Sequence, residues 1–181
     1  MPVANRWQRI GSAGSMYWVL IRDATNEDWP EIWSFFRVIV AAGETFSYDR
    51  DMPEDQARQV WLIEPPGRTV VAIEQDGGAL VGTAKMHANH GGGAAHVATA
   101  SFMVDPQHPG RGIGRALGEH VVAWAQAEGF RLMQFNAVVE SNLRAVQLWR
   151  LLGFEVLGTL PQGFHHPVDG YVGLHVMYRT L

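Results

Sequence analysis

The stretch best suited to chemistry is a glycine-rich segment, Val104-Asp-Pro-Gln-His-Pro-Gly-Arg-Gly-Ile-Gly-Arg-Ala-Leu117. Gly110, Gly112 and Gly114 stand at alternate positions, immediately before a run of residues with helical periodicity. Glycine lets the backbone come close to a ligand, and the free N–H groups at the start of a helix attract an anion. The spacing predicts a phosphate-binding turn. The alternative is a glycine-rich helix start that holds no ligand.

Two common phosphate-binding motifs do not fit this segment. A Walker loop requires Gly-Lys-Ser/Thr after its spacer, and no such triplet occurs in the chain. A dinucleotide-binding turn requires its glycines directly behind a strand, with a third glycine where Leu117 stands. Here Asp105–Pro109 separates the predicted strand from the glycines. Both motifs therefore fail on spacing.

The segment is similar to a motif of the GCN5-related N-acetyltransferase (GNAT) family, Val-x-Pro-x-x-Arg/Gln-Gly-x-Gly-Ile-Gly-x-x-Leu. The matching positions are Val104, Pro106, Gly110, Gly112, Ile113, Gly114 and Leu117. A second family motif, Asn-x-x-Ala-x-x-Leu-Tyr-x-x-x-Gly-Phe, is matched by Asn142, Ala145, Leu148, Gly153 and Phe154, with Trp149 at the tyrosine position. The resemblance extends over about residues 17–181, with both motifs in register.

The resemblance implies acetyl-CoA as co-substrate and direct attack of an amine on its thioester. The N–H groups that would hold the pyrophosphate are those of Gly110, Arg111, Gly112, Ile113, Gly114 and Arg115. The backbone at Met103 and Val104 would pair with the pantetheine arm like an added strand, and an N–H there would polarise the thioester carbonyl. Asn142 would contact the pantetheine amides, or would act as the N-cap of the following helix.

Two positions depart from the family pattern. Pro109 replaces the usual Arg or Gln before the glycines, which removes a side chain and an N–H donor and shifts phosphate contacts onto Arg111 and Arg115. Trp149 replaces the tyrosine proposed in the family as the general acid, and an indole N–H is not a practical acid. A thiol with a pKa near 8.5 is a fair leaving group without one, so we assign no general acid.

Candidate catalytic residues come from the acceptor side of the site. An amine is mostly protonated at pH 7 and must lose a proton before it attacks. Glu44, Glu140 and His96 are candidate bases, and Glu44 is favoured because the family's corresponding loop lines the acceptor cleft. A surface carboxylate at a helix end is the alternative reading of Glu44. Asn136 is expected on the strand beside the splayed part of the sheet, facing the acceptor or the thioester carbonyl.

The elements that must position these residues follow from hydrophobic periodicity and turn signals. Strands are predicted at 17–22, 69–74, 79–88, 95–104, 132–138, 154–160 and 171–178, and helices at 27–42, 54–63, 113–128 and 142–152. This order predicts an α+β domain. The resemblance implies a mixed, mostly antiparallel central sheet flanked by helices and splayed between its fourth and fifth strands. Residues 1–15 are predicted to be a flexible extension, and residues 16–181 a single domain.

Composition restricts the partners. The 181 residues carry a net charge of −4, which argues against a nucleic-acid binder, and the absence of cysteine excludes disulfides and thiolate zinc sites. No segment has the length or pattern of a membrane span or an export signal. The histidines show no recognised metal-site spacing, so no metal is expected. We expect a cytoplasmic location, with a homodimer as the candidate assembly. The segment Gly163–Tyr171 would then shape the acceptor pocket or a dimer contact.

Together these observations predict an acetyl-CoA-dependent N-acetyltransferase that modifies the primary or secondary amine of a small molecule. The loop Glu44-Thr-Phe-Ser-Tyr48 resembles the family branch that acetylates amino acids and related compounds. Two alternatives remain open. One is a protein or peptide N-acetyltransferase. The other is a CoA-binding module without catalysis, motivated by Pro109 and Trp149.

Overall fold

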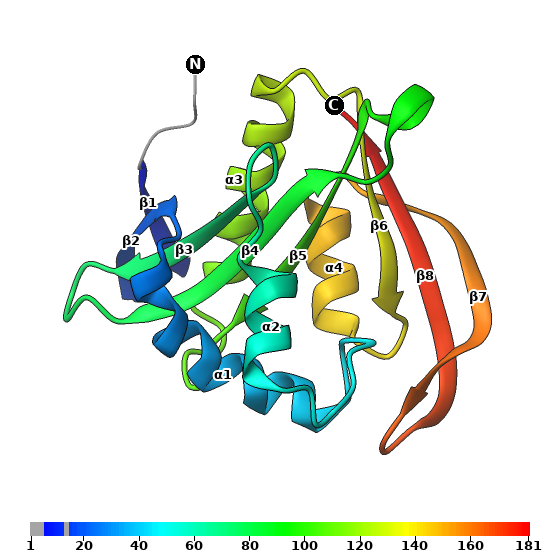
Figure 1. Cartoon of the computed structure of the whole chain (residues 1–181), viewed down its shortest axis with the longest axis horizontal. Helices are drawn as coiled ribbons and strands as arrows, with labels where there is room; N and C mark the ends of the chain where they lie inside the picture. Colours follow the sequence, from blue (N-terminus) through cyan, green and yellow to red (C-terminus); the bar gives the residue numbers. More distant parts are fainter. Residues whose placement is uncertain (1–5, 13–14) are drawn as a thin grey trace.

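The computed structural model describes residues 6–12 and 15–181, which build one eight-stranded sheet with helices on both faces (Figure 1). The sheet order is β1-β2-β3-β4-β5-β6-β8-β7. The strands are β1 (Arg6–Ser12), β2 (Ser15–Asp23), β3 (Arg68–Glu74), β4 (Leu80–Ala88), β5 (Val97–Val104), β6 (Leu132–Val139), β7 (Glu155–His166) and β8 (Gly170–Thr180). The helices are α1 (Trp29–Ala42), α2 (Glu54–Trp61), α3 (Ile113–Ala127) and α4 (Leu143–Leu151), with short 3-10 turns η1 (Asn26–Asp28) and η2 (Gly92–Ala94). The predicted α+β class is confirmed.

The helices form two layers, each with its own core. On one face α1 and α2 pack around Phe36 and Trp61, which are fully buried. On the other face α3 and α4 pack around Leu117 and Phe154. Apolar residues spaced three and four apart along α1 and α3 give each helix one buried stripe, as the periodicity predicts. The sheet therefore separates an α1/α2 face from an α3/α4 face.

The 3-10 turn η1, which leads into α1, is fixed by a buried carboxylate. Asp28 accepts hydrogen bonds from the Thr25 N–H (2.7 Å) and from both terminal nitrogens of Arg22 (2.7 and 2.8 Å). Burial by itself raises the pKa of Asp28, but the hydrogen bonds and charge of Arg22 and the hydrogen bonds from Thr25 outweigh it and lower the pKa. Asp28 thus closes a capping box with Thr25 at the 3-10 turn η1, which leads directly into α1.

The predicted splay of the sheet is confirmed. β5 and β6 run parallel and pair only at Val97↔Leu132 and Ala98↔Met133. Beyond these pairs the strands diverge, while β5 stays paired with β4 along its whole length. On the α3/α4 face, three aromatic rings pack together where β5 and β6 diverge. The centres of the Phe102 and Phe135 rings lie 4.6 and 4.8 Å from the centre of the Trp149 ring. Of the described residues, no strand pairs with the second edge of β5 after Ala98.

The N-terminal prediction is wrong for residues 6–12. These residues form β1, which pairs antiparallel with β2 from Arg6↔Ile21 to Ser12↔Ser15. The physical reason is that β2 offers an open sheet edge, and pairing places Ile10, which is 8 % exposed, in the α3/α4 core. The rest of the predicted extension that lies in 1–5 and 13–14 falls outside the described residues.

The C-terminal strands are longer than predicted. The glycine-, proline- and histidine-rich stretch expected as a loop belongs largely to β7, which continues to His166 and pairs with β8. The register shifts between Leu160 and Phe164, so the pairing resumes after Pro161 and Gly163. Phe164 is buried again at 8 % exposure. Within the described part of the chain, no helix has the length and apolar character needed to cross a membrane.

Candidate active site

The glycine segment forms a tight turn that leaves N–H groups free at the start of α3. Gly110 and Gly112 have φ values of +72° and +86°, a left-handed conformation that other residues adopt only with strain. The first helical hydrogen bond runs from the Ala116 N–H to the Gly112 carbonyl at 3.0 Å. The N–H groups of Ile113 and its two successors therefore have no acceptor inside the helix. This geometry suits an anion such as a pyrophosphate.

The later glycines of this region serve helix packing, a role that the sequence reasoning missed. A Cβ on Gly114 would lie 3.3 Å from Leu148 Cδ2, and a Cβ on Gly118 would lie 2.5 Å from Leu152 Cδ1. Leu148 lies in α4 and Leu152 is its C-cap residue, so these glycines let α3 and α4 approach closely. The one available signal was the spacing of four between Gly114 and Gly118, which places both on the same side of the helix. The phosphate contact of Gly114 stays a prediction.

The turn is held against the N-terminal strands. The Arg111 guanidinium forms an ion pair with Glu74 and lies over the Tyr17 ring at 5.1 Å. A Cβ on Gly112 would lie only 3.5 Å from the Ile10 Cβ and the Gly11 nitrogen of β1. The Arg111 side chain therefore points to the end of β3, and a phosphate contact through it would compete with Glu74. Its backbone N–H stays a predicted donor.

Asp105 shapes the approach to the predicted phosphate site, and an ion pair engages one of the arginines expected to bind phosphate. The Asp105 carboxylate accepts a hydrogen bond from the Gln107 N–H (2.9 Å), and the Asp105 carbonyl accepts one from the His108 N–H (2.9 Å). These bonds shape the connection between β5 and the turn. The exposed Arg115 side chain is paired with Glu119 on α3 at 2.7 Å. Both arginines expected to compensate for Pro109 are thus engaged with carboxylates.

The edge of β5 beside the splayed gap is suited to an extended ligand. Met103 and Val104 pair with Thr83 and Gly82 of β4 on one side only. The Met103 side chain, which is 2 % exposed, packs into the α1/α2 core. The Val104 side chain packs on the opposite face. The Asp105 N–H donates to the Val81 carbonyl, so strand alternation turns the Met103 main chain toward β4 as well and leaves the Val104 main chain on the unpaired edge, available for the predicted strand-like contact with pantetheine.

Asn142 and Trp149 take structural positions in α4. Asn142 Oδ1 accepts a hydrogen bond from the Ala145 N–H at 3.2 Å, which confirms its predicted N-cap role. The predicted contact of Asn142 with pantetheine remains a prediction. Trp149, at the family's tyrosine position, is 7 % exposed and packs between Phe102 and Phe135. Its ring fills the bottom of the splayed gap and offers no acid to a leaving group.

A polar strip lies on the α1/α2 face of β4, where strand alternation places Thr83, Lys85 and His87 on the same side. The Lys85 ammonium donates hydrogen bonds to the Val60 carbonyl (2.6 Å) and to the Tyr48 hydroxyl (3.1 Å). Burial lowers the pKa of Lys85 and raises the pKa of Tyr48. Sequence reasoning assigned Lys85 no role. The signal that could have identified Lys85 was the presence of a lone lysine at an inward-facing position of a mostly apolar strand.

Asn136 lies on the same face, but its amide is already engaged. Asn136 Oδ1 accepts hydrogen bonds from Asn89 Nδ2 (3.1 Å) and Gln134 Nε2 (2.7 Å). Its Nδ2 donates to Asn89 Oδ1 at 2.7 Å. This pair joins the end of β4 to β6 across the intervening β5. A catalytic role for Asn136 stays a prediction, and it would require this amide pair to open or to act as a unit.

Glu44 follows the end of α1 and has a free carboxylate. Gly43, with φ of +69°, ends the helix, and Glu44 stands exposed in the loop that carries Tyr48. Its carboxylate has no hydrogen bond or ion pair with the residues that the structure describes. The competing candidate Glu140 accepts a hydrogen bond from the Gly173 N–H at 3.0 Å. The role of Glu44 as the base stays a prediction, and the structure joins Glu44 to neither Asn136 nor Lys85.

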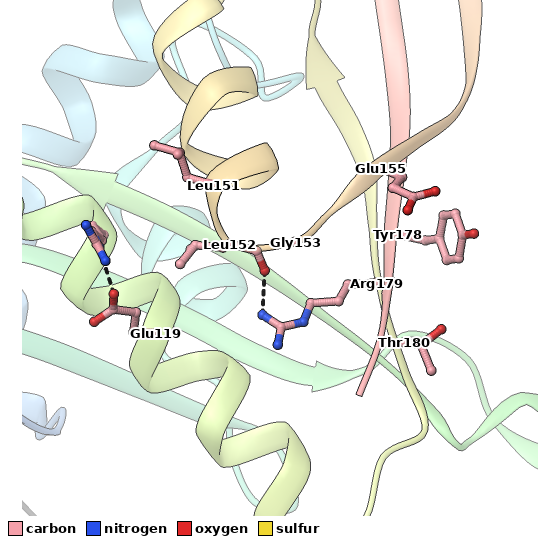
Figure 2. A pocket seen from close by; sticks show the side chains of 9 residues that line it. Glu119, Leu151, Leu152, Gly153, Glu155, Tyr178, Arg179 and Thr180 are labelled. Carbon is pink, nitrogen blue, oxygen red and sulfur yellow. Dashed lines mark hydrogen bonds and ion pairs between the residues drawn. The ribbon is translucent and has the colours of Figure 1, made fainter.

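A hollow of about 500 Å³ lies on the α3/α4 side, between the two helices and the end of β8 (Figure 2). It is lined by Arg115, Glu119, Leu151, Leu152, Gly153, Glu155, Tyr178, Arg179 and Thr180. Figure 2 shows Arg179 directed at the Leu152 carbonyl and Glu119 joined to its neighbour on α3. The hollow shares Arg115 with the glycine turn and adjoins it. Within the described ranges, no group of three or more metal-ligating side chains comes together.

This chain resembles solved structures over most of its length, including the following two. A GCN5-related N-acetyltransferase from Kribbella flavida is 54 % identical, with a TM-score of 0.87 over 90 % of this chain and 98 % of that chain. A GNAT superfamily phosphinothricin acetyltransferase from Sinorhizobium meliloti, solved in complex with AcCoA, is 25 % identical, with a TM-score of 0.80. That likeness covers 90 % of this chain and 88 % of the Sinorhizobium chain.

Sequence relatives and a family match agree with the structural likeness. The N-acetyltransferase aca1 of Schizosaccharomyces pombe is 30 % identical over 99 residues, which span 52 % of this chain but only 47 % of the yeast protein. The L-methionine sulfoximine/L-methionine sulfone acetyltransferase of Pseudomonas aeruginosa is 29 % identical over 151 residues, or 78 % of this chain and 83 % of that protein. Residues 18–154 match the acetyltransferase (GNAT) family. With both motifs on the elements that the family requires, the chain belongs to the GNAT acetyltransferase family.

Proposed function

We propose that the protein is an acetyl-CoA-dependent N-acetyltransferase that acts on the primary or secondary amine of a small molecule. The observation that carries this proposal is the left-handed turn at Gly110 and Gly112, which joins the unpaired edge of β5 to the free N–H groups at the start of α3. Backbone donors of this kind bind phosphate without a basic surface, which suits a chain of net charge −4. The likeness to a family member solved with AcCoA supports the choice of donor.

In the proposed reaction the acceptor amine enters from the α1/α2 face and attacks the thioester carbonyl carbon. A C–N bond forms, the C–S bond breaks, and the sulfur leaves as a thiolate. The nitrogen gives up its proton to a base, for which we propose Glu44. The Val104 N–H, on the unpaired edge of β5, would polarise the carbonyl, and Asn136 would help to place the acceptor.

The names of two relatives and the polar side chains on the α1/α2 face of the sheet favour a small acceptor. The Pseudomonas relative is named for derivatives of methionine, and the Sinorhizobium relative for phosphinothricin. On that face the Lys85 ammonium and the Tyr48 hydroxyl lie beside the Trp61 ring, which favours a compact molecule with polar groups. We therefore propose an acceptor of similar size.

The test is a thiol-release assay with acetyl-CoA over a panel of small amines and lysine-containing peptides, run beside calorimetric binding of CoA. We expect turnover with small amines and little with peptides. Turnover confined to peptides would favour a protein or peptide acetyltransferase. CoA binding without turnover of any amine would favour a binding module without catalysis.

A further inference from the structure

Lys85 occupies an unusual electrostatic position. It is the only lysine in the chain and stands in the middle of β4, paired with Thr69 of β3 and Ser101 of β5. Its ammonium lies 5.5 Å from the centre of the Trp61 ring and 5.8 Å from that of Tyr48. Aromatic faces and neutral oxygens surround the charge, and no carboxylate of the described residues forms an ion pair with it.

The hydrogen bonds of this ammonium are incomplete within the described residues. An ammonium has three donors, and Lys85 uses two of them, for the Val60 carbonyl and the Tyr48 hydroxyl. A partly buried positive charge without a counter-ion is costly, and an anion from outside would remove that cost. The structure thus has a fixed cation, held by α2 and by the loop after α1, with one hydrogen-bond donor left to offer.

The position of Lys85 relates directly to the proposed acetyl-transfer site. Lys85 and Ser101 are cross-strand partners, and Met103 lies two residues further along β5 on the same face. Such diagonal neighbours lie about 7–8 Å apart in a sheet. The base of the Lys85 side chain is therefore one strand row away from the backbone at which the thioester is proposed to lie, and its ammonium extends from there to α2 and the loop after α1, on the same face of the sheet. An acceptor with its amine at that backbone could place an acidic group a few bonds away on Lys85.

We propose that Lys85 binds a carboxylate of the acceptor, and that the acceptor is an amino acid or a compound with an amino-acid-like pairing of amine and acid. This inference rests on the proposed acetyltransferase function and deepens it by assigning a substrate class and the residue that selects it. Tyr48 acts through Lys85 as a positioning residue, because its hydroxyl helps to fix the direction of the ammonium.

The first experiment compares matched acceptors. The probes are L-methionine sulfone and its carboxamide, which differ mainly in the charge next to the amine. We expect the acid form to have a KM at least about tenfold lower than the amide form, because a hydrogen bond between charged groups is worth more than one between neutral groups. Calorimetric binding of the same two probes, in the presence of CoA, measures the preference without turnover.

The second experiment changes the cation. Lys85→Met keeps most of the side-chain length and removes the charge, whereas Lys85→Arg retains a charge at this site. Lys85→Met should abolish the preference for the acid by raising its KM about tenfold or more, with little change in the KM of the amide. Lys85→Arg should restore part of the preference. Arg37→Gln, on the exposed part of α1, is the control for the loss of one positive charge.

A purely structural role for Lys85 makes a different prediction. Because Lys85 also holds Tyr48 and Val60, Lys85→Met could loosen the loop after α1 and lower activity with every acceptor. Equal losses with the acid and the amide would overturn the proposal, and so would equal binding of the two probes by the parent protein. Failure of the acetyltransferase function has its own signature, which is CoA binding without thiol release from any amine.

Discussion

The donor side and the acceptor side of the site obtain their polar groups from different sources. On the donor side, N–H groups of one continuous turn, from Gly110 to Arg115, are the expected ligand contacts. On the acceptor side, side chains come together from β4, β6 and the loop after α1, as Lys85, Asn136 and Tyr48 show. Main-chain donors are unaffected by most substitutions, whereas side-chain donors can be exchanged one at a time. The donor should therefore be shared across the family, while the acceptor can differ between members.

The first prediction tests the main-chain character of the donor side and has the largest expected effect. Gly112→Asp forces a side chain onto a backbone with φ of +86° and places a carboxylate at the proposed phosphate site. We expect acetyl-CoA affinity to fall about a hundredfold or more, measured by calorimetry.

The matched control for this variant is Gly77→Asp. Gly77 has a similar φ of +91° but lies in the turn between β3 and β4, with nothing within 4 Å of its Cβ position. It should lose stability without losing CoA affinity. Unchanged affinity in Gly112→Asp would remove the glycine turn from the donor site.

The second prediction tests whether the acceptor side supplies the base. Glu44→Gln should lower kcat by about a hundredfold and flatten the rise of rate with pH, because a positioned base contributes on that scale. Acetyl-CoA affinity should stay as in the parent. Glu64→Gln, another exposed carboxylate, is the control. If the pH–rate profile of Glu44→Gln matches that of the parent, Glu44 is a surface residue and the base lies elsewhere.

The third prediction concerns the packing that holds the donor side together. Gly118→Ala would place a Cβ 2.5 Å from Leu152 Cδ1 and 3.2 Å from the Trp149 ring. Alanine favours a helix over glycine by about 1 kcal/mol, whereas overpacking costs about 1–3 kcal/mol. We expect a net loss in the free energy of unfolding, measured by urea denaturation. Gly93→Ala, where nothing lies within 4 Å, is the control. A gain in stability would show that α4 moves aside freely.

The fourth prediction has the smallest effect and concerns the start of α1, which leads to the acceptor loop. Asp28→Asn should cost about 1 kcal/mol of unfolding free energy at pH 7, because it weakens a cap and an ion pair with Arg22. The pKa of Asp28 is lowered on folding, so its contribution is complete above its unfolded value of about 3.9 and is lost as pH falls through the folded value. The stability difference between the parent and Asp28→Asn should therefore shrink below about pH 4. A difference independent of pH would contradict the assignment.

The donor side could be predicted from the sequence, whereas the acceptor side could not. The donor motif is contiguous, so the turn and the helix after it could be predicted from Val104 to Leu117 and are found as α3 and its approach. Lys85 and Tyr48 lie far apart in the sequence and meet only because β4 faces the loop after α1. No local pattern contains that information. The amide pair of Asn89 and Asn136 is hidden in the same way, since it depends on how β5 and β6 diverge.

Prediction failed at both sheet edges for a related reason. β1 contains the mixed run Arg-Trp-Gln-Arg-Ile-Gly-Ser, which has little strand character of its own and gains it by pairing with β2. In β7 the residues Pro161 and Gly163 favour a loop, but a shift of register allows the strand to continue. Pairing partners outweighed local propensity in each case.

The close approach of β1 to Gly112 links the beginning of the described chain to events at the turn. Because Ile10 and Gly11 lie directly behind that glycine, a ligand that rigidifies the turn should also suppress local opening of the β1–β2 hairpin. Amide hydrogen exchange in this hairpin should then slow when CoA binds, although the hairpin need not touch the ligand. An affinity tag or a truncation at this end would then change the affinity for the acetyl donor. Hydrogen exchange in the hairpin would report whether the donor site is occupied, even without contact between the hairpin and the ligand.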